Sequence, residues 1–174
     1  SPILANKLLI PLVPLALTAP LTNHGAAHIE LALQHASAAC AALWLTLLGT
    51  EVERRGLLLF TPDFQNLVNE TCSGVSTLCT LLVYAILIGV ILRLGNTMTG
   101  LIAVLTIPLS IGLNGARIAS VSLLGEHGGT PLAMGPMHDV TGVVAFGIGY
   151  GMLFTGMWWL ARRGARRVQS KSPK

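Results

Sequence analysis

The chain has 174 residues, of which 52% are hydrophobic and 10% are charged, and its formal net charge is +4. Soluble domains carry about 25% charged residues, so this composition excludes an ordinary water-exposed globular protein and favours an integral membrane protein. Six of the eleven Lys and Arg residues lie between Arg162 and Lys174. Such a cluster is typical of a cytoplasmic tail beside a membrane helix, not of a nucleic-acid-binding surface.

A helix needs about 20 apolar residues to span a bilayer, and five stretches of the chain approach this length. In chain order they cover about Ile3–Leu21, His28–Leu48, Cys72–Leu92, Thr97–Leu124 and His138–Leu160. The sequence therefore predicts an all-α fold, a polytopic transmembrane bundle of about five helices within residues 1–161, followed by a basic cytoplasmic tail at 162–174. Because the chain begins with Ser1 and not with Met, further helices could precede it in the full protein.

Two longer segments connect the predicted helices. Residues 49–71 lie between the second and third helices, are acidic, and alternate apolar and polar residues around Leu57, Leu59 and Phe60. They predict a short extracytoplasmic hairpin or interfacial strand. Residues 125–137 contain several glycines and prolines and predict a loop.

The basic tail sets the predicted orientation, because Lys and Arg are enriched in cytoplasmic segments. With the tail in the cytoplasm, the last helix begins outside at His138 and the third begins outside at Cys72. Arg117 lies seven residues before Leu124, about 10 Å along a helix axis, so it can share this level. We expect a multi-pass protein of the plasma (inner) membrane with these three residues on the extracytoplasmic side.

Cys72 lies where the acidic segment meets an apolar helix, in the sequence ETCSG at positions 70–74. A thiol in the first helical turn is stabilised as the thiolate by the helix dipole and by unpaired backbone N–H groups. The thiolate is the nucleophile. Gly74 would allow another backbone to approach closely. The alternative for any membrane cysteine is packing as a small apolar residue, which is our interpretation of Cys40 and Cys79.

Asn114 and Arg117 are three positions apart, a spacing that places both on one helix face. An arginine inside an apolar helix is costly unless it is paired or hydrated. Its guanidinium could hold a carboxylate or stabilise an oxyanion. The alternative is an arginine that extends to the lipid headgroups.

His138 opens the last predicted helix, and an imidazole at this position can act as a base and then as an acid. Below it, Gly142, Ala145 and Gly149 form a small-residue lane that permits close helix contact. The alternative is a polar cap at the interface. The neighbouring Asp139 is expected to cap the helix. The other histidines have no matched partners, so neither a metal site nor another cofactor is expected; they are His24, His28, His35 and His127.

In this order on three predicted helices, the motifs resemble those of the exosortase/archaeosortase family, over about residues 43–160. The matching residues are the catalytic candidates Cys72, Arg117 and His138, the supporting residues Glu70, Ser73, Gly74 and Asn114, and Gly142 and Phe146 in the last helix. The resemblance implies a membrane cysteine peptidase or transpeptidase. Its partners would be membrane-anchored exported proteins whose C-terminal sorting signal combines a short motif, a membrane helix and a basic end. No nucleic-acid partner is implied.

The resemblance also implies a role for each residue. Cys72 would form a thioester with the substrate. His138 would protonate the leaving amine and then activate the acceptor. Arg117, supported by Asn114, would stabilise the oxyanion or orient the substrate.

Two other functions remain open from the sequence. A non-enzymatic transporter or assembly subunit would use Arg117 and His138 in an ion or proton path. That path should continue toward the cytoplasm, where the third to fifth helices are nearly all apolar. A protease that only hydrolyses would differ from a transpeptidase solely in its acceptor.

Overall fold

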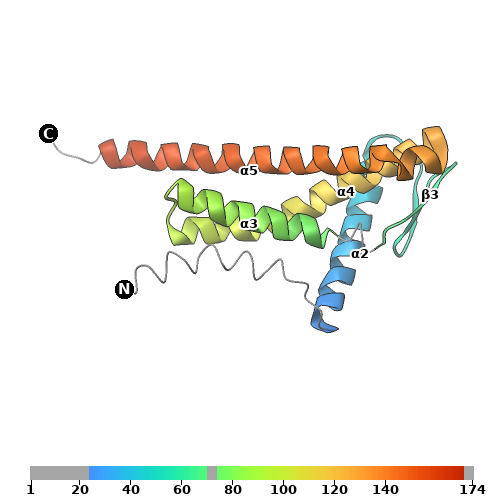
Figure 1. Cartoon of the computed structure of the whole chain (residues 1–174), viewed down its shortest axis with the longest axis horizontal. Helices are drawn as coiled ribbons and strands as arrows, with labels where there is room; N and C mark the ends of the chain where they lie inside the picture. The colour runs from blue at the N-terminus through green and yellow to red at the C-terminus, as the bar shows by residue number, and fades with distance from the viewer. Residues whose placement is uncertain (1–23, 70–73, 171–174) are drawn as a thin grey trace.

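The computed structural model describes residues 24–69 and 74–170, and the side chains of residues 27–69, 74–135 and 137–163. Helices α3 (Val75–Ile91) and α5 (Pro136–Ser170) follow the long axis of the molecule, and α4 (Asn96–Met134) lies against both. Helix α2 (His24–Leu47) runs across this axis and packs on α4 (Figure 1). A small sheet lies at the same end as the start of α5 (Figure 1).

Four of the predicted helices match helices of the structure, and the first, Ile3–Leu21, lies outside the described residues. Within the described part, α4 and the Met137–Arg163 stretch of α5 are long and apolar enough to cross a membrane, and α3 is a shorter apolar helix. Large side chains on α5 face outward, among them Val143, whose exposed fraction is 71%. This outward apolar surface suits contact with lipid.

The segment between α2 and α3 forms a three-stranded antiparallel sheet, which confirms the predicted hairpin or strand and adds a third strand, so the fold is mainly helical and not all-α. Its strands are β1 (Glu53–Arg55), β2 (Leu58–Phe60) and β3 (Gln65–Leu67), in the order β1-β2-β3. Gly56 turns the first hairpin at a φ of 66°. Leu59 is completely buried and belongs to a core with α2 and α4, as the alternation of apolar and polar residues predicts.

The predicted loop at residues 125–137 is also wrong, because α4 continues to Met134. The helix is broken at Gly129, where φ is 67° and ψ is −172°. Pro131 follows two residues later; proline is compatible with the first turn of a helix, so helical structure resumes there. After Gly135 the chain reverses and α5 begins. This reversal returns His138 to the side of α4.

Small residues allow the three long-axis helices to pack closely. A Cβ atom on Gly149 of α5 would lie 2.6 Å from Leu113 of α4 and 3.2 Å from Leu81 of α3. Both leucines belong to a core cluster that also contains Ala85, Ile102, Leu153 and Met157. The close packing expected of the small-residue lane is confirmed at Gly149.

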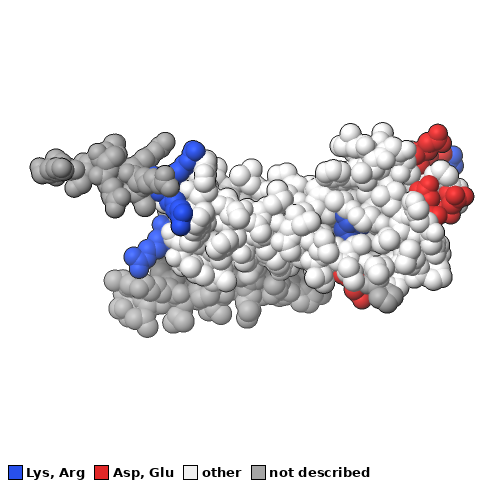
Figure 2. Space-filling model, turned by 90° about the horizontal axis from the view of Figure 1, so that it is seen from above, with Lys and Arg blue, Asp and Glu red and all other residues white. Residues whose placement is uncertain are grey.

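Charged side chains are concentrated at the two ends of the molecule, with a largely uncharged band between them (Figure 2). Exposed Arg93, Arg162 and Arg163 are among the basic residues. The guanidinium groups of Arg162 and Arg163 stack 3.5 and 3.4 Å from the ring centres of Trp158 and Trp159. Around the sheet, exposed carboxylates include Glu51, Glu53 and Asp63. Glu53 forms an ion pair with Arg55.

Candidate active site

Arg117 of α4 and His138 of α5 form a direct contact. The Arg117 Nη2 and His138 Nε2 atoms are 2.9 Å apart. A guanidinium group can only donate hydrogen bonds, so Nε2 must accept. The imidazole in this arrangement is therefore neutral and carries its proton on Nδ1. The two residues are 21 positions apart in the sequence, and the reversal after α4 brings them together.

Gly142 makes room for the Arg117 side chain one helical turn after His138. A Cβ atom on Gly142 would lie 3.4 Å from Arg117 Nε and 3.5 Å from Cζ. The Nε atom is buried and has no hydrogen-bond partner among the described residues. Arg117 is thus held against α5 while some of its donors are not engaged by the described protein groups.

A cavity of about 100 Å³ lies beside the Arg117–His138 pair. It is lined by Arg117, His138, Asn66, Leu67, Val68, Asn69, Ile118, Val121 and Met134. His138 Nδ1 is buried and has no hydrogen-bond partner in the described part of the chain. A second cavity of about 190 Å³ adjoins Arg117 between α4 and α5. Its lining includes the small residues Ala116, Ser120, Thr141 and Ala145.

A buried hydrogen bond fixes β3 against the site. Asn66 Nδ2 donates to Ser122 Oγ at 3.0 Å, and the Ser122 hydroxyl donates to the Ile118 carbonyl at 3.0 Å. This contact places the segment after β3 over Arg117. The sequence interpretation did not single out Asn66 or Ser122. The sequence could have indicated that Asn66 is buried, because Asn66 shares a strand face with the buried Val68.

Three of the predicted site residues, Cys72, Glu70 and Ser73, lie outside the described residues. Both flanks of this segment are described. Asn69 lines the cavity with Arg117 and His138. Gly74 has a φ of 80° and caps the N-terminus of α3. A Cβ atom on Gly74 would lie 2.9 Å from Asn114 Nδ2, so the close approach that this glycine allows is to a side chain and not to a backbone.

The start of α3 differs from the prediction. The helix begins at Val75 and not at Cys72, because Gly74 adopts a left-handed conformation there. Cys72, which precedes the N-cap residue by two positions in the sequence, lies outside the described residues. Asn114 is almost fully buried and contacts Gly74, whereas Arg117 contacts His138. One stretch of α4 thus meets the beginnings of both α3 and α5.

The other two cysteines line neither of the two cavities beside Arg117. Cys40 of α2 packs on α4, where a Cβ atom on Gly115 would lie 2.8 Å from its Sγ atom. Cys79 is a half-buried free thiol within α3. Among the described residues, no group of three or more His, Cys, Asp or Glu side chains could hold a metal ion.

Comparison with known proteins identifies the family. The family model described as transmembrane exosortase (Exosortase_EpsH) matches residues 3–155. No curated protein and no solved structure matches the chain. The family match covers most of the chain and includes the segment between Cys72 and His138. The chain belongs to the transmembrane exosortase family, a family of membrane cysteine peptidases and transpeptidases.

Proposed function

We propose that this protein cleaves the C-terminal sorting signals of exported proteins through a Cys72 thioester and transfers them to an acceptor. The observation that supports this most is the Arg117–His138 contact beside a cavity lined by Asn69. Asn69 precedes Cys72 by three residues, and Gly74 follows it by two. Two residues of extended chain span at most about 7 Å. Gly74, which contacts Asn114, therefore lies within about 7 Å of Cys72 along the chain.

The proposed reaction begins with attack of the Cys72 sulfur on a substrate carbonyl carbon. His138 takes the thiol proton, and the carbonyl oxygen becomes an oxyanion that Arg117 stabilises with its N–H donors. When the oxyanion collapses, the C–N bond breaks and His138 returns the proton to the leaving amine. A thioester on Cys72 remains, and an acceptor hydroxyl, amine or water then attacks its carbonyl carbon while losing a proton to His138. The C–S bond breaks, and the Cys72 sulfur leaves and takes that proton back from His138.

The Arg117–His138 contact adds a condition to this mechanism. While Arg117 donates to Nε2, the neutral imidazole has no free lone pair with which to accept a proton. The guanidinium must therefore turn from Nε2 toward the substrate oxygen before His138 can act as a base. Substrate binding would then release the base and supply the oxyanion stabiliser in one movement.

The second cavity adjoining Arg117 supports a place for the substrate's own membrane helix. Its small residues on α4 and α5 would permit close helix packing. The proposed orientation puts the basic end of the molecule in the cytoplasm and the sheet, with the site, on the extracytoplasmic side.

A transport function is less well supported. Toward the basic end, the hydroxyls of Thr106, Ser110 and Thr155 donate to carbonyls of their own helices. Such bonds satisfy the hydroxyls locally, and they do not extend the polar pair of Arg117 and His138 into a continuous path.

The test uses an exported reporter that carries a C-terminal sorting signal from the same genome. At matched membrane abundance, Cys72→Ala should abolish processing, because alanine removes the nucleophile and adds no bulk. Cys40→Ala and Cys79→Ala are the matched controls and should retain most processing. Processing by Cys72→Ala, together with loss in Cys79→Ala, would assign the reaction to the wrong thiol.

A further inference from the structure

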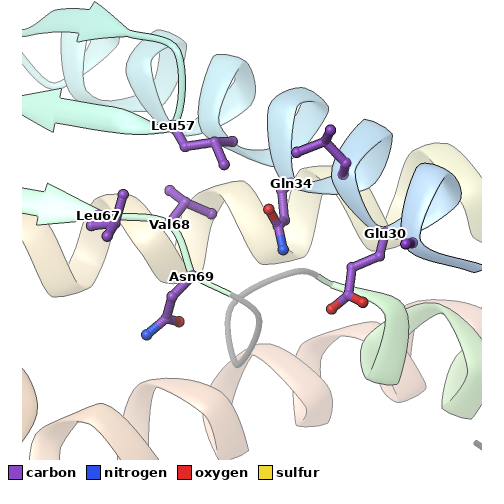
Figure 3. Close-up of a pocket in the computed structure, with 8 residues that line it drawn as sticks. Glu30, Gln34, Leu57, Leu67, Val68 and Asn69 are labelled. Atoms are coloured by element: carbon purple, nitrogen blue, oxygen red, sulfur yellow. The ribbon is translucent and has the colours of Figure 1, made fainter. Parts of the chain in front are cut away.

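A separate cavity lies between α2 and the sheet, and neither Arg117 nor His138 lines it. It is an open groove with a volume of about 620 Å³, within the range typical of ligand pockets. Leu31, Leu57, Leu67 and Val68 supply apolar walls, and Ala27, Glu30, Gln34 and Asn69 complete the lining (Figure 3). We refer to it as the Glu30 pocket.

Two polar side chains of α2 face this pocket. Glu30 and Gln34 are one helical turn apart, and Figure 3 shows both projecting from the same side of α2. Gln34 is only 6% exposed, and its amide forms no hydrogen bond within the described residues. Glu30 has no ion pair within them.

Such groups in an apolar pocket favour a polar ligand. Glu30 is partly buried, and a ligand that covers its carboxylate must supply a cation or a hydrogen-bond donor, because a carboxylate removed from water without one is costly. The Gln34 amide can accept a further hydrogen bond beside the carboxylate. Apolar walls around two acceptors match a cationic head on an aliphatic stem, which is the chemistry of a Lys or Arg side chain.

The Glu30 pocket adjoins the candidate active site. Leu67, Val68 and Asn69 line both this pocket and the smaller cavity that contains Arg117 and His138. The two cavities therefore share one three-residue segment of their lining. An extended peptide advances about 3.3 Å per residue, so a peptide at the active site could place a side chain a few residues away in the pocket.

We propose that the Glu30 pocket is a specificity subsite that binds a Lys or Arg side chain of the peptide substrate. Glu30 pairs with the cation, Gln34 accepts a second hydrogen bond, and the leucines contact the stem. The inference rests on the proposed function for its substrate, but cation binding by the pocket does not depend on Cys72.

The first experiment measures binding of n-pentylguanidinium and n-pentylammonium to the full chain in lipid nanodiscs by NMR titration, with n-pentanol as the uncharged control. Both cations should bind, and Glu30→Gln should weaken them at least tenfold. Glu51→Gln removes the same charge at an exposed position and should leave binding unchanged. Equal binding by wild type and Glu30→Gln would overturn the inference.

The second experiment identifies the source of the cation with the reporter substrate. In the reporter, each Lys or Arg on the extracytoplasmic side of the reporter's membrane helix is changed in turn to Glu. One such change should lower processing by wild type at least tenfold, and Glu30→Lys should restore processing of that reporter. If no reporter shows this exchange, or if Glu30→Gln slows only transfer to an added amine and not cleavage, the assignment to a peptide side chain is wrong.

The two proposals fail separately. Cys72→Ala should bind both cations as wild type does. Cation binding without any processing would count against the proposed function alone. Processing without Glu30-dependent cation binding would count against the subsite alone.

Discussion

Arg117 carries more hydrogen-bond donors than its described surroundings accept. A guanidinium has five N–H groups; one nitrogen, Nη2, contacts His138, and the buried Nε has no described partner. An arginine that merely extended to the headgroups would leave its donors to water and lipid. The part-buried guanidinium in contact with the imidazole instead keeps donors without a described acceptor beside the candidate site.

This geometry predicts the outcome of Arg117→Lys. Lysine keeps the charge but cannot hold two parallel donors in one plane, so processing of the reporter should fall on the order of 100-fold or more. Arg162→Lys, at the exposed basic end, is the matched control and should process normally. Near-normal turnover by Arg117→Lys would remove Arg117 from the catalytic group and leave it as a membrane anchor.

Some residues of the two candidate sites could be predicted from the sequence, and others could not. Arg117 and His138 could be selected because ionisable groups in apolar helices are costly and therefore functional candidates. Glu30 meets the same criterion, but its spacing to Gln34 has meaning only once the sheet encloses them. Asn66 could not be recognised either, since its partner Ser122 is 56 residues away.

At the scale of elements, the start of α3 is determined by one glycine. Gly74 takes a φ of 80° and its Cα faces Asn114 of α4. Left-handed conformations cost roughly 1–2 kcal/mol in other residues, and a Cβ atom would also crowd the Asn114 amide. The residue therefore sets both where α3 begins and how closely it meets α4.

The corresponding prediction is that Gly74→Ala lowers the melting temperature of the detergent-solubilised protein and reduces reporter processing several-fold. The substitution should lower the free energy of unfolding by about 1–3 kcal/mol. Gly95→Ala is the control, because Gly95 caps α4 with a φ of −62° and has open space around its Cα. Equal effects of the two substitutions would show that the conformation of Gly74 does not matter.

The elements that the sequence predicted poorly are those that depend on context. Glycines and prolines in 125–137 suggested a loop, yet proline fits the first turn of the helix that resumes after Gly129. The short strands could be anticipated as a hairpin from alternation, whereas the third strand depends on packing against α4. The long apolar helices were predictable because their composition alone requires a membrane.

At the scale of the whole molecule, charge separation supports one membrane orientation. Basic side chains gather at the end opposite the sheet, the sheet end carries acidic side chains together with Arg54 and Arg55, and the band between the ends is largely uncharged (Figure 2). The two described helices that are long enough to span a membrane both cross this band. The proposed arrangement places the sheet outside and the basic end inside.

The orientation predicts the accessibility of each end. In a variant with Cys40→Ala and Cys79→Ala, an impermeant maleimide applied to intact cells should label the remaining Cys72. An epitope fused after Lys174 should resist external protease until the cells are permeabilised. Removal of that epitope from intact cells would reverse the orientation and place the site in the cytoplasm.

The central claim is that Cys72 carries the substrate as a thioester, and the most direct measurement is mass spectrometry of the acid-quenched wild-type protein during reporter processing. The Cys72 peptide should carry the reporter's new C-terminus through a bond that neutral hydroxylamine cleaves. Cys72→Ala should yield no adduct. An adduct on Cys79, or continued processing with no cysteine-linked intermediate at any time point, would contradict the account.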